Sequence, residues 1–216
     1  MITVSPSLIG MLLECPRCLW LHFKENVRRP SGPFPSLPGG MDGVLKTYFD
    51  GYRKKGALPL EIEGRVSEKL FDGVEKLNEW RNNRVGIKWE FPVLEIILKG
   101  AIDELLVNDA GELVVFDFKT RGWPTKEDSH RYYQTQLNLY ALLFGSNGYE
   151  VADYGYLLFF WPEKYEKGGA LFKTDLVKMR LDPASGLKTL EEVHKIIKSE
   201  KPPANENCGF CRYRTD

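Results

Sequence analysis

The chain has 216 residues, of which 43% are hydrophobic and 28% are charged. These values are ordinary for a globular protein with a buried core, so we expect a single domain over residues 1–216 and exclude a disordered or low-complexity chain. Basic and acidic residues number 30 each, so the bulk positive charge of many nucleic-acid-binding proteins is absent. No apolar run approaches the ~18 residues of a membrane span, and the N-terminus lacks the basic start and apolar core of a signal peptide. We therefore expect a cytoplasmic protein without membrane contact.

Two Cys-x-x-Cys pairs lie near the two ends of the chain, and they comprise Cys15, Cys18, Cys208 and Cys211. Disulfides are rare in the cytosol and no cysteine is left over, so the four thiols predict a shared metal site. Such a site would join segment 1–29 to segment 200–216 and close a very long loop. Four thiolates suit tetrahedral Zn²⁺ or an iron–sulfur cluster, and pairs with an internal Pro or Gly are common in zinc knuckles. Either metal would be structural.

The segment between the first cysteines and the middle of the chain predicts a loop and two helices. Residues 30–40 are rich in Pro and Gly and predict a loop. Apolar spacing predicts helices over 41–52 and 65–84. Asp42 and Lys46 share a face of the first helix, where a surface ion pair is the simpler interpretation. Residues 87–97 predict a strand, with Glu90 as an exposed edge residue or a site carboxylate.

A hairpin follows, with strands expected over 98–107 and 112–120 and the loop Asp109-Ala110-Gly111 between them. Glycine at the last loop position suits the left-handed conformation that closes a three-residue turn. In that register Asn108 pairs with Glu112, and Asp103 lies opposite Asp117. Directly opposed side chains have Cβ atoms roughly 4.5 to 5.5 Å apart, where two negative charges destabilise the sheet.

A divalent cation would offset this repulsion, because Mg²⁺ binds one or two carboxylates together with water and substrate phosphate. Strand alternation places Lys119 on the face of Asp117, and Phe116 and Phe118 on the other face. Two carboxylates beside a lysine suit phosphodiester hydrolysis, because the ion polarises the phosphoryl group and the lysine assists the attacking water. The alternative is a surface hairpin with scattered charges.

A helix is expected over 129–144, with Gln136 and Tyr140 four residues apart on one face. The amide of Gln136 could bind substrate or metal-bound water, although a solvent-facing Gln beside a core Tyr is the simpler alternative. His130 is expected to be a cap or surface residue. Two strands, over 154–161 and 170–180, and a helix over 187–198 complete the chain.

Basic residues cluster directly after the second hairpin strand, where they alternate with aromatic residues. Such clusters are usually solvated faces, but aromatic rings beside Arg and Lys can also stack bases and hold a single strand. The cluster consists of Arg121, Lys126 and Arg131, interleaved with Trp123, Tyr132 and Tyr133.

Three motifs in this order resemble the core of RecB-type nucleases of the PD-(D/E)xK superfamily: Gly-x-x-Asp at 100–103, Asp-x-Lys at 117–119 and Gln-x-x-x-Tyr at 136–140. The resemblance implies an α/β, restriction-endonuclease-like core over 87–180, in which helices flank a mixed central sheet and further helices are added at the N-terminus. It also implies that Asp103 and Asp117 bind Mg²⁺ or Mn²⁺, helped by the carbonyl of Phe118, that Lys119 is catalytic, and that Gln136 and Tyr140 belong to the site.

Two features connect the chain to a narrower group. The opening Ser5-Pro-Ser-Leu and Cys15-Pro-Arg resemble CRISPR-associated and AddB-like nucleases, which carry a [4Fe-4S] cluster on one N-terminal and three C-terminal cysteines. The resemblance therefore implies iron–sulfur at the four thiols, although this chain has two cysteines at each end. Relatives carry a metal-binding His on the helix at 41–52. This chain has none there, and Asp42, Lys46 or Asp50 could occupy that place, with Asp42 as the candidate metal ligand.

The sequence thus predicts a metal-dependent deoxyribonuclease, an exonuclease acting on single-stranded DNA ends in CRISPR adaptation, and hence antiviral defence, or in DNA repair. An adaptation integrase or a helicase is the expected protein partner. The alternative is a catalytically impaired DNA-binding or structural subunit of such a complex, in which the missing His is decisive.

Overall fold

The computed structural model describes residues 1–30, 32 and 36–212, beginning with an extended strand and three helices. These are β1 (Ile2–Val4), α1 (Pro6–Glu14), α2 (Pro16–Lys24) and α3 (Ser36–Arg53). The prediction of a loop over 30–40 is wrong from Ser36 onward, because α3 already begins there. Pro38 fits this place, since the N–H groups of a first helical turn have no partner within the helix. Positions 31 and 33–35 lie outside the described residues.

The remaining elements include both strands and helices, with several strands directly following one another along the chain. They are β2 (Lys69–Leu70), α4 (Val74–Arg81), β3 (Ile87–Phe91), the 3₁₀ turn η1 (Pro92–Leu94), β4 (Ile96–Gly100), β5 (Glu104–Val107), β6 (Leu113–Thr120), the 3₁₀ turn η2 (Ser129–Tyr133), α5 (Gln134–Ser146), β7 (Val151–Glu166), β8 (Gly169–Arg180), α6 (Pro183–Lys198) and α7 (Gly209–Arg212).

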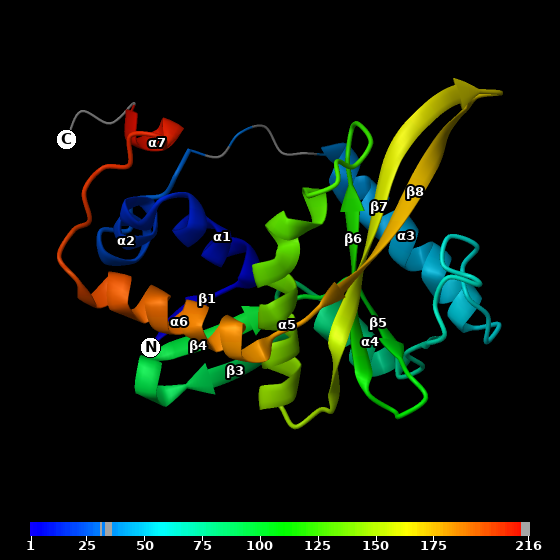
Figure 1. Ribbon diagram of the computed structural model, residues 1–216, viewed down its shortest axis with the longest axis horizontal. Coiled ribbons are helices and arrows are strands. Elements are labelled where there is room, and N and C mark those ends of the chain that lie inside the picture. Colours follow the sequence, from blue (N-terminus) through cyan, green and yellow to red (C-terminus); the bar gives the residue numbers. More distant parts are fainter. Residues whose placement is uncertain (31, 33–35, 213–216) are drawn as a thin grey trace.

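A five-stranded mixed sheet forms the centre of the molecule, in the order β2-β5-β6-β7-β8 (Figure 1). Strands β6 and β7 are parallel, and the other neighbours are antiparallel. Helix α3 packs on one face, where Phe49 contacts Phe116 and Phe118. Helix α5 packs on the other face, where Leu137 joins a core that includes Val115. The predicted fold class, a mixed sheet flanked by helices, is confirmed.

A second, three-stranded sheet has the order β1-β4-β3, with β1 parallel to β4. The single strand predicted over 87–97 is wrong, because it is interrupted by η1. Pro92 cannot donate to a strand ladder, and Glu95 adopts a left-handed φ of 54° that turns the chain back on itself. Glu90 is exposed on β3, the edge strand of this sheet, which confirms the simpler of its two interpretations.

The strand predicted over 98–107 is also wrong, because it is two strands in two different sheets. Strand β4 ends at Gly100, residues 101–103 cross between the sheets, and β5 begins at Glu104. The crossing segment is held by hydrogen bonds to other elements, among them one from the Ile102 N–H to the carbonyl of Trp80 at 3.2 Å. The first predicted carboxylate, Asp103, therefore lies on a connection between two sheets.

Only part of the helix predicted over 65–84 is present, since α4 covers Val74–Arg81. Gly64 and Gly73 bracket the missing part, and Gly64 has a left-handed φ of 69°. Between them Lys69 and Leu70 pair with β5, so tertiary pairing overrides the apolar spacing of this short segment.

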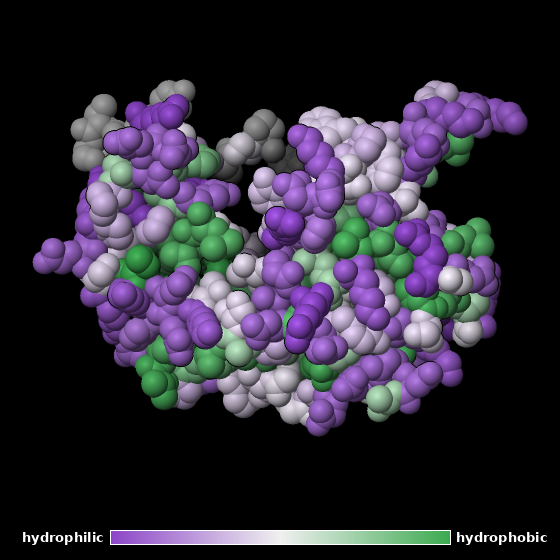
Figure 2. Space-filling view, in the orientation of Figure 1, coloured by the Kyte–Doolittle hydropathy of each residue, from purple (hydrophilic) through white to green (hydrophobic). Residues whose placement is uncertain are grey.

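The last two strands form a ribbon that extends beyond the rest of the sheet. The pairing of β6 with β7 ends at Thr120 and Phe160, whereas the pairing of β7 with β8 continues to Glu166 and Gly169. The projecting tip is visible at the upper right of Figure 1, and Figure 2 shows that its surface is mostly hydrophilic. Within the part of the chain that the structure describes, none of the helices has both the length and the apolar character that a bilayer crossing needs.

Candidate nuclease site and cysteine cluster

The two predicted acidic ligands lie opposite each other, as the hairpin register requires. Glu104 pairs with Phe116, and the Asn108 N–H bonds the carbonyl of Glu112 at 3.2 Å, so the same register places Asp103 opposite Asp117. Asp103 Oδ2 accepts a hydrogen bond from the Phe118 N–H at 3.0 Å. The predicted loop and register of the hairpin are confirmed for β5 and β6, and Gly111 has the expected left-handed φ, at 83°.

Asp117 is an unusual carboxylate because it is only 2% exposed at the centre of the sheet. Burial, and then the negative charge of Asp103, raise its pKa to about 7. Lys119 lies on the same face and forms an ion pair with Asp117, and its ammonium lies 4.6 Å from the ring centroid of Tyr133. Burial opposes the charged form of Lys119, but the nearby carboxylates outweigh it and raise its pKa.

Helix α5 brings Gln136 and Tyr140 to this pair of carboxylates. Gln136 Nε2 lies 3.4 Å from Asp117 Oδ1 and 3.5 Å from the hydroxyl of Tyr140. The Tyr140 hydroxyl donates to the carbonyl of Ala101 at 2.7 Å and so ties α5 to the crossing segment. A Cβ at Gly100 would lie 2.8 Å from the Tyr140 ring, which explains the glycine of the first motif. The three motifs therefore meet at one place.

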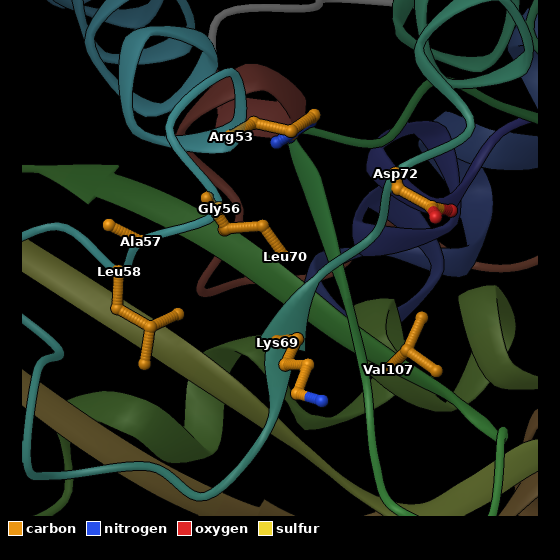
Figure 3. A pocket seen from close by; sticks show the side chains of 8 residues that line it. All are labelled: Arg53, Gly56, Ala57, Leu58, Lys69, Leu70, Asp72 and Val107. Carbon is orange, nitrogen blue, oxygen red and sulfur yellow. The ribbon is translucent and has the colours of Figure 1, made fainter.

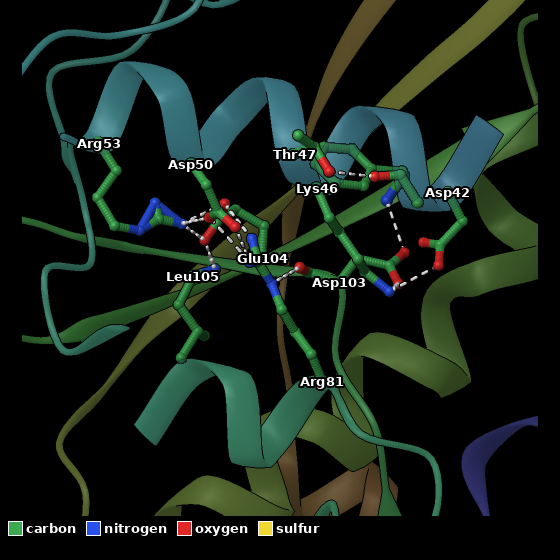
Figure 4. Close-up of polar contacts among 11 residues, drawn as sticks. Asp42, Lys46, Thr47, Asp50, Arg53, Arg81, Asp103, Glu104 and Leu105 are labelled. Carbon is green, nitrogen blue, oxygen red and sulfur yellow. Dashed lines mark hydrogen bonds and ion pairs between the residues drawn. The ribbon is translucent and has the colours of Figure 1, made fainter. Parts of the chain in front are cut away.

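Helix α3 approaches the same carboxylates from the other side with Asp42 and Lys46 (Figure 4). Lys46 Nζ lies 2.8 Å from Asp42 Oδ2 and 3.2 Å from Asp103 Oδ1. The predicted ion pair between Asp42 and Lys46 is therefore present, and Asp103 extends it toward the candidate site. His22 and His194 contact Phe23 and the carbonyl of Leu94 respectively, and His130 lies in η2.

Sequence reasoning missed a buried ionic network that fixes the backbone of Asp103 (Figure 4). Glu104 has no exposed surface, and its oxygens accept from Arg53 Nη2 at 2.6 and 2.5 Å and from Arg81 Nη2 at 2.8 Å. Arg81 also donates to both oxygens of Asp50, at 2.9 and 3.0 Å, and through Nε to the carbonyl of Asp103 at 2.8 Å. The sequence signal that could have indicated this network is Glu104, a charged residue that begins an otherwise apolar strand directly after Asp103.

A cavity of about 320 Å³ lies behind this network, between the end of α3, the following loop and the β2–β5 edge (Figure 3). Arg53, Lys69 and Asp72 contribute its polar groups, and Leu58, Leu70 and Val107 its apolar walls. None of the predicted catalytic residues lines it. A second cavity, of about 430 Å³, opens beside the first turn of α1 and reaches Tyr140.

The raised pKa of Asp117 predicts a pH-dependent metal affinity. The folded pKa of Asp117 exceeds the unfolded value of about 3.9. Its protonation therefore contributes fully to folding stability at pH values below about 3.9, and this stabilisation is lost as the pH rises through about 7. A bound cation requires the ionised form, so Mn²⁺ affinity should rise with pH up to about 7 and then level off. Calorimetry in buffers of different ionisation enthalpy should detect proton release below that pH. Asp117→Asn should abolish the release, and a wild-type affinity independent of pH would contradict the assignment.

The four cysteines form a second cluster, at the opposite side of the molecule from the ribbon, where α7 lies against α2 (Figure 1). All four sulfur atoms lie within 4.8 Å of one another, and three separations are 3.5, 3.7 and 4.0 Å. The predicted gathering of the four thiols is confirmed. Burial raises the pKa of the Cys18 thiol to about 12, whereas burial of Cys208 is outweighed by hydrogen bonds from the Cys211 and Phe210 backbone, which lower the pKa of that thiol to about 7.

Arg29, also missed by sequence reasoning, connects both ends of the chain at this cluster. It forms an ion pair with Glu14, and its Nη2 lies 3.9 Å from Cys208 Sγ. Its guanidinium carbon lies 4.5 Å from the ring centroid of Phe210. Because such outer contacts orient metal ligands, Arg29 is part of the cysteine site.

Comparison with known proteins places this geometry in a family. A family model described as the PD-(D/E)XK nuclease superfamily matches residues 42–215. A solved structure titled "Crystal structure of SSO0001" is 17% identical to the chain with a TM-score of 0.46, and the match covers 92% of this chain and 78% of that chain. The comparison with curated proteins gave no match. The family model spans most of the chain and all five residues predicted to be catalytic, so the chain belongs to the PD-(D/E)XK nuclease superfamily.

Proposed function

We propose that the chain hydrolyses DNA phosphodiester bonds with Mg²⁺ or Mn²⁺ bound by Asp103 and Asp117. The observation that carries this proposal is the opposed carboxylate pair, in which burial and then the negative charge of Asp103 raise the pKa of Asp117 to about 7. Two such carboxylates suit a hard divalent cation, which would neutralise both. When bound, the ion supplies Lewis acidity and a more acidic water.

Other residues of the chain would orient the attacking water, stabilise charge and position the metal ligands. Lys119, ion-paired with Asp117, would orient the attacking water and stabilise charge on the phosphoryl oxygens. Gln136 would hold Asp117 in place, and Tyr140 would hold the crossing segment through the carbonyl of Ala101. The carbonyl of Phe118 and the carboxylate of Asp42 are proposed as further ligands.

A single strand with a free end is the proposed substrate. Trp123 and Tyr132 are 68% and 81% exposed, on the segment that follows the catalytic strand and beside Arg121 and Arg131. Exposed rings beside guanidinium groups can stack unpaired bases while the cations contact phosphates. The resemblance of the motifs to RecB-type, CRISPR-associated nucleases supports exonucleolytic trimming in CRISPR adaptation or repair, in the cytoplasm and together with an integrase or helicase.

We further propose that residues 1–216 act as one nuclease unit closed by the cysteine site. The resemblance implies [4Fe-4S] at these thiols, but the sulfur separations support a single ion. Zinc–sulfur bonds of about 2.3 Å give tetrahedral S···S separations of about 3.8 Å, close to the observed 3.5, 3.7 and 4.0 Å. A four-iron cluster places each thiolate on a different iron and spaces the sulfurs more widely.

Cleavage of labelled DNA tests the proposed reaction. With Mn²⁺, wild-type protein should shorten single-stranded DNA, and Lys119→Ala should be slower by about 10² to 10³, the usual cost of removing one group that stabilises transition-state charge. Lys76→Ala, which removes a half-exposed lysine from α4, is the matched control and should cleave at the wild-type rate. Equal rates for wild type and Lys119→Ala would contradict the proposal.

A second candidate function is a DNA-binding or structural subunit that has lost catalysis. The observation in its favour is that α3 presents Lys46, rather than a neutral ligand, to Asp103. In that case the wild-type chain and Lys119→Ala would bind DNA equally well and neither would cleave it.

A further inference from the structure

Each of the two site carboxylates has its own lysine, and the two lysines come from different elements. Lys119 on β6 pairs with Asp117, whereas Lys46 on α3 lies 3.2 Å from Asp103. Lys46 and Asp103 are each 20% exposed, so this contact is largely removed from solvent and only weakly screened. Lys46 has a second partner, Asp42, at 2.8 Å, whose side chain is 43% exposed and lies at the rim.

The charges of this group decide what Lys46 can do. With Asp117 in the ionised form that binds a cation, three carboxylates and two ammonium groups leave a net charge of −1 in the site. The adjacent network adds nothing, because Arg53 and Arg81 balance Asp50 and Glu104. A divalent cation would bring the site to +1, which attracts a phosphodiester. Without Lys46 the site would carry −2, hold a cation more strongly, and be neutral after binding it.

We propose that Lys46 is a substrate-binding residue of the nuclease site: its ammonium neutralises Asp103 while no metal is bound, and contacts the phosphate of the DNA strand once a cation replaces it there. The inference rests on the proposed function. A cation on Asp103 removes most of the attraction that holds the ammonium at this carboxylate, while Asp42 keeps Lys46 at the rim. Lys46 from α3 and Lys119 from β6, each held at one of the two carboxylates, would then both be available to bind the phosphate of the DNA strand.

Lys46→Met tests both parts of this proposal by binding rather than cleavage. Calorimetry should show roughly tenfold tighter Mn²⁺ binding at the acidic site, because one competing positive charge is gone. In Ca²⁺, which occupies such sites, fluorescence anisotropy should show roughly tenfold weaker binding of a labelled single-stranded oligonucleotide. Lys198→Met, which removes a helical lysine paired with Glu95, is the matched control and should change neither affinity.

The outcomes separate this inference from the proposed function. An unchanged affinity of Lys46→Met for either Mn²⁺ or DNA overturns it, and so does weaker Mn²⁺ binding. If the wild-type chain itself binds no DNA, the proposed function fails, while the Mn²⁺ comparison still judges the first part of the inference. Lys46→Gln provides a second variant at the same position. Asp42→Asn tests the role of Asp42: Mn²⁺ affinity should stay near wild type if Asp42 only anchors Lys46, and should weaken if Asp42 is a metal ligand.

Discussion

Cys211→Ser is expected to lower the melting temperature strongly. The substitution removes one of four clustered sulfurs, and the free energy of metal binding at such sites, about 10 to 16 kcal/mol in zinc-finger peptides, is coupled to folding. The sheets and α5 retain their own core, so we expect α7 to detach from α2 while the central sheet stays folded. Calorimetry and metal analysis, before and after chelation, measure the effect.

Chelation provides the internal control for this prediction. A chelator should lower the melting temperature of the wild type to that of Cys211→Ser, and should change the variant little. One equivalent of zinc in colourless protein would support the single-ion site, whereas brown protein absorbing near 400 nm would support iron–sulfur. A variant that melts with the wild type, or a chelator without effect, would show that the thiols do not hold a structural metal.

The second large effect is expected at Glu104, where substitution by Gln should cost roughly 3 to 5 kcal/mol of unfolding free energy. Glu104 is fully buried between Arg53 and Arg81, and the amide leaves the two guanidinium groups with Asp50 as their remaining negative partner in this network. Burial raises the pKa of Glu104, but the two arginines oppose that shift. Because Arg81 also holds the carbonyl of Asp103, the variant should lose Mn²⁺ affinity as well.

Urea denaturation at fixed zinc concentration measures the change, with Glu163→Gln as the matched control. Glu163 pairs with Lys173 at 2.7 Å on the projecting ribbon, where both side chains are about half exposed. An exposed pair contributes at most about 1 kcal/mol, so this control should be nearly as stable as the wild type. Equal losses in the two variants would mean that burial of Glu104 does not set the strength of the network.

The hairpin could be predicted from sequence because its determinants are local. A three-residue loop ending in Gly111 fixes the register, and the register then brings Asp103 opposite Asp117. Alternation along β6 likewise placed Phe116 and Phe118 on the opposite face from Lys119. Each of these inferences needs only residues within one turn or one strand.

The remaining features depend on contacts between distant segments, which no local pattern contains. The strand expected over 98–107 is divided because its two halves pair with different partners. Arg53 and Arg81 belong to helices that approach β5 from far along the chain, and their roles appear only when Glu104 is seen to be buried.

The cysteine cluster also determines when, during synthesis of the chain, the metal site can be completed. Cys18 and Cys208 are 190 positions apart, so the first pair of thiols leaves the ribosome long before its partners exist. The hairpin, α5 and the ribbon can all form in that interval, before Cys208 and Cys211 are available to complete the metal site with Cys15 and Cys18. Any product that stops before Cys208 would keep the acidic site and the packing of Ile9, Leu12 and Leu19 in the core, but would lack half of the thiols. Its unanchored C-terminal end would then be the part most open to proteolysis.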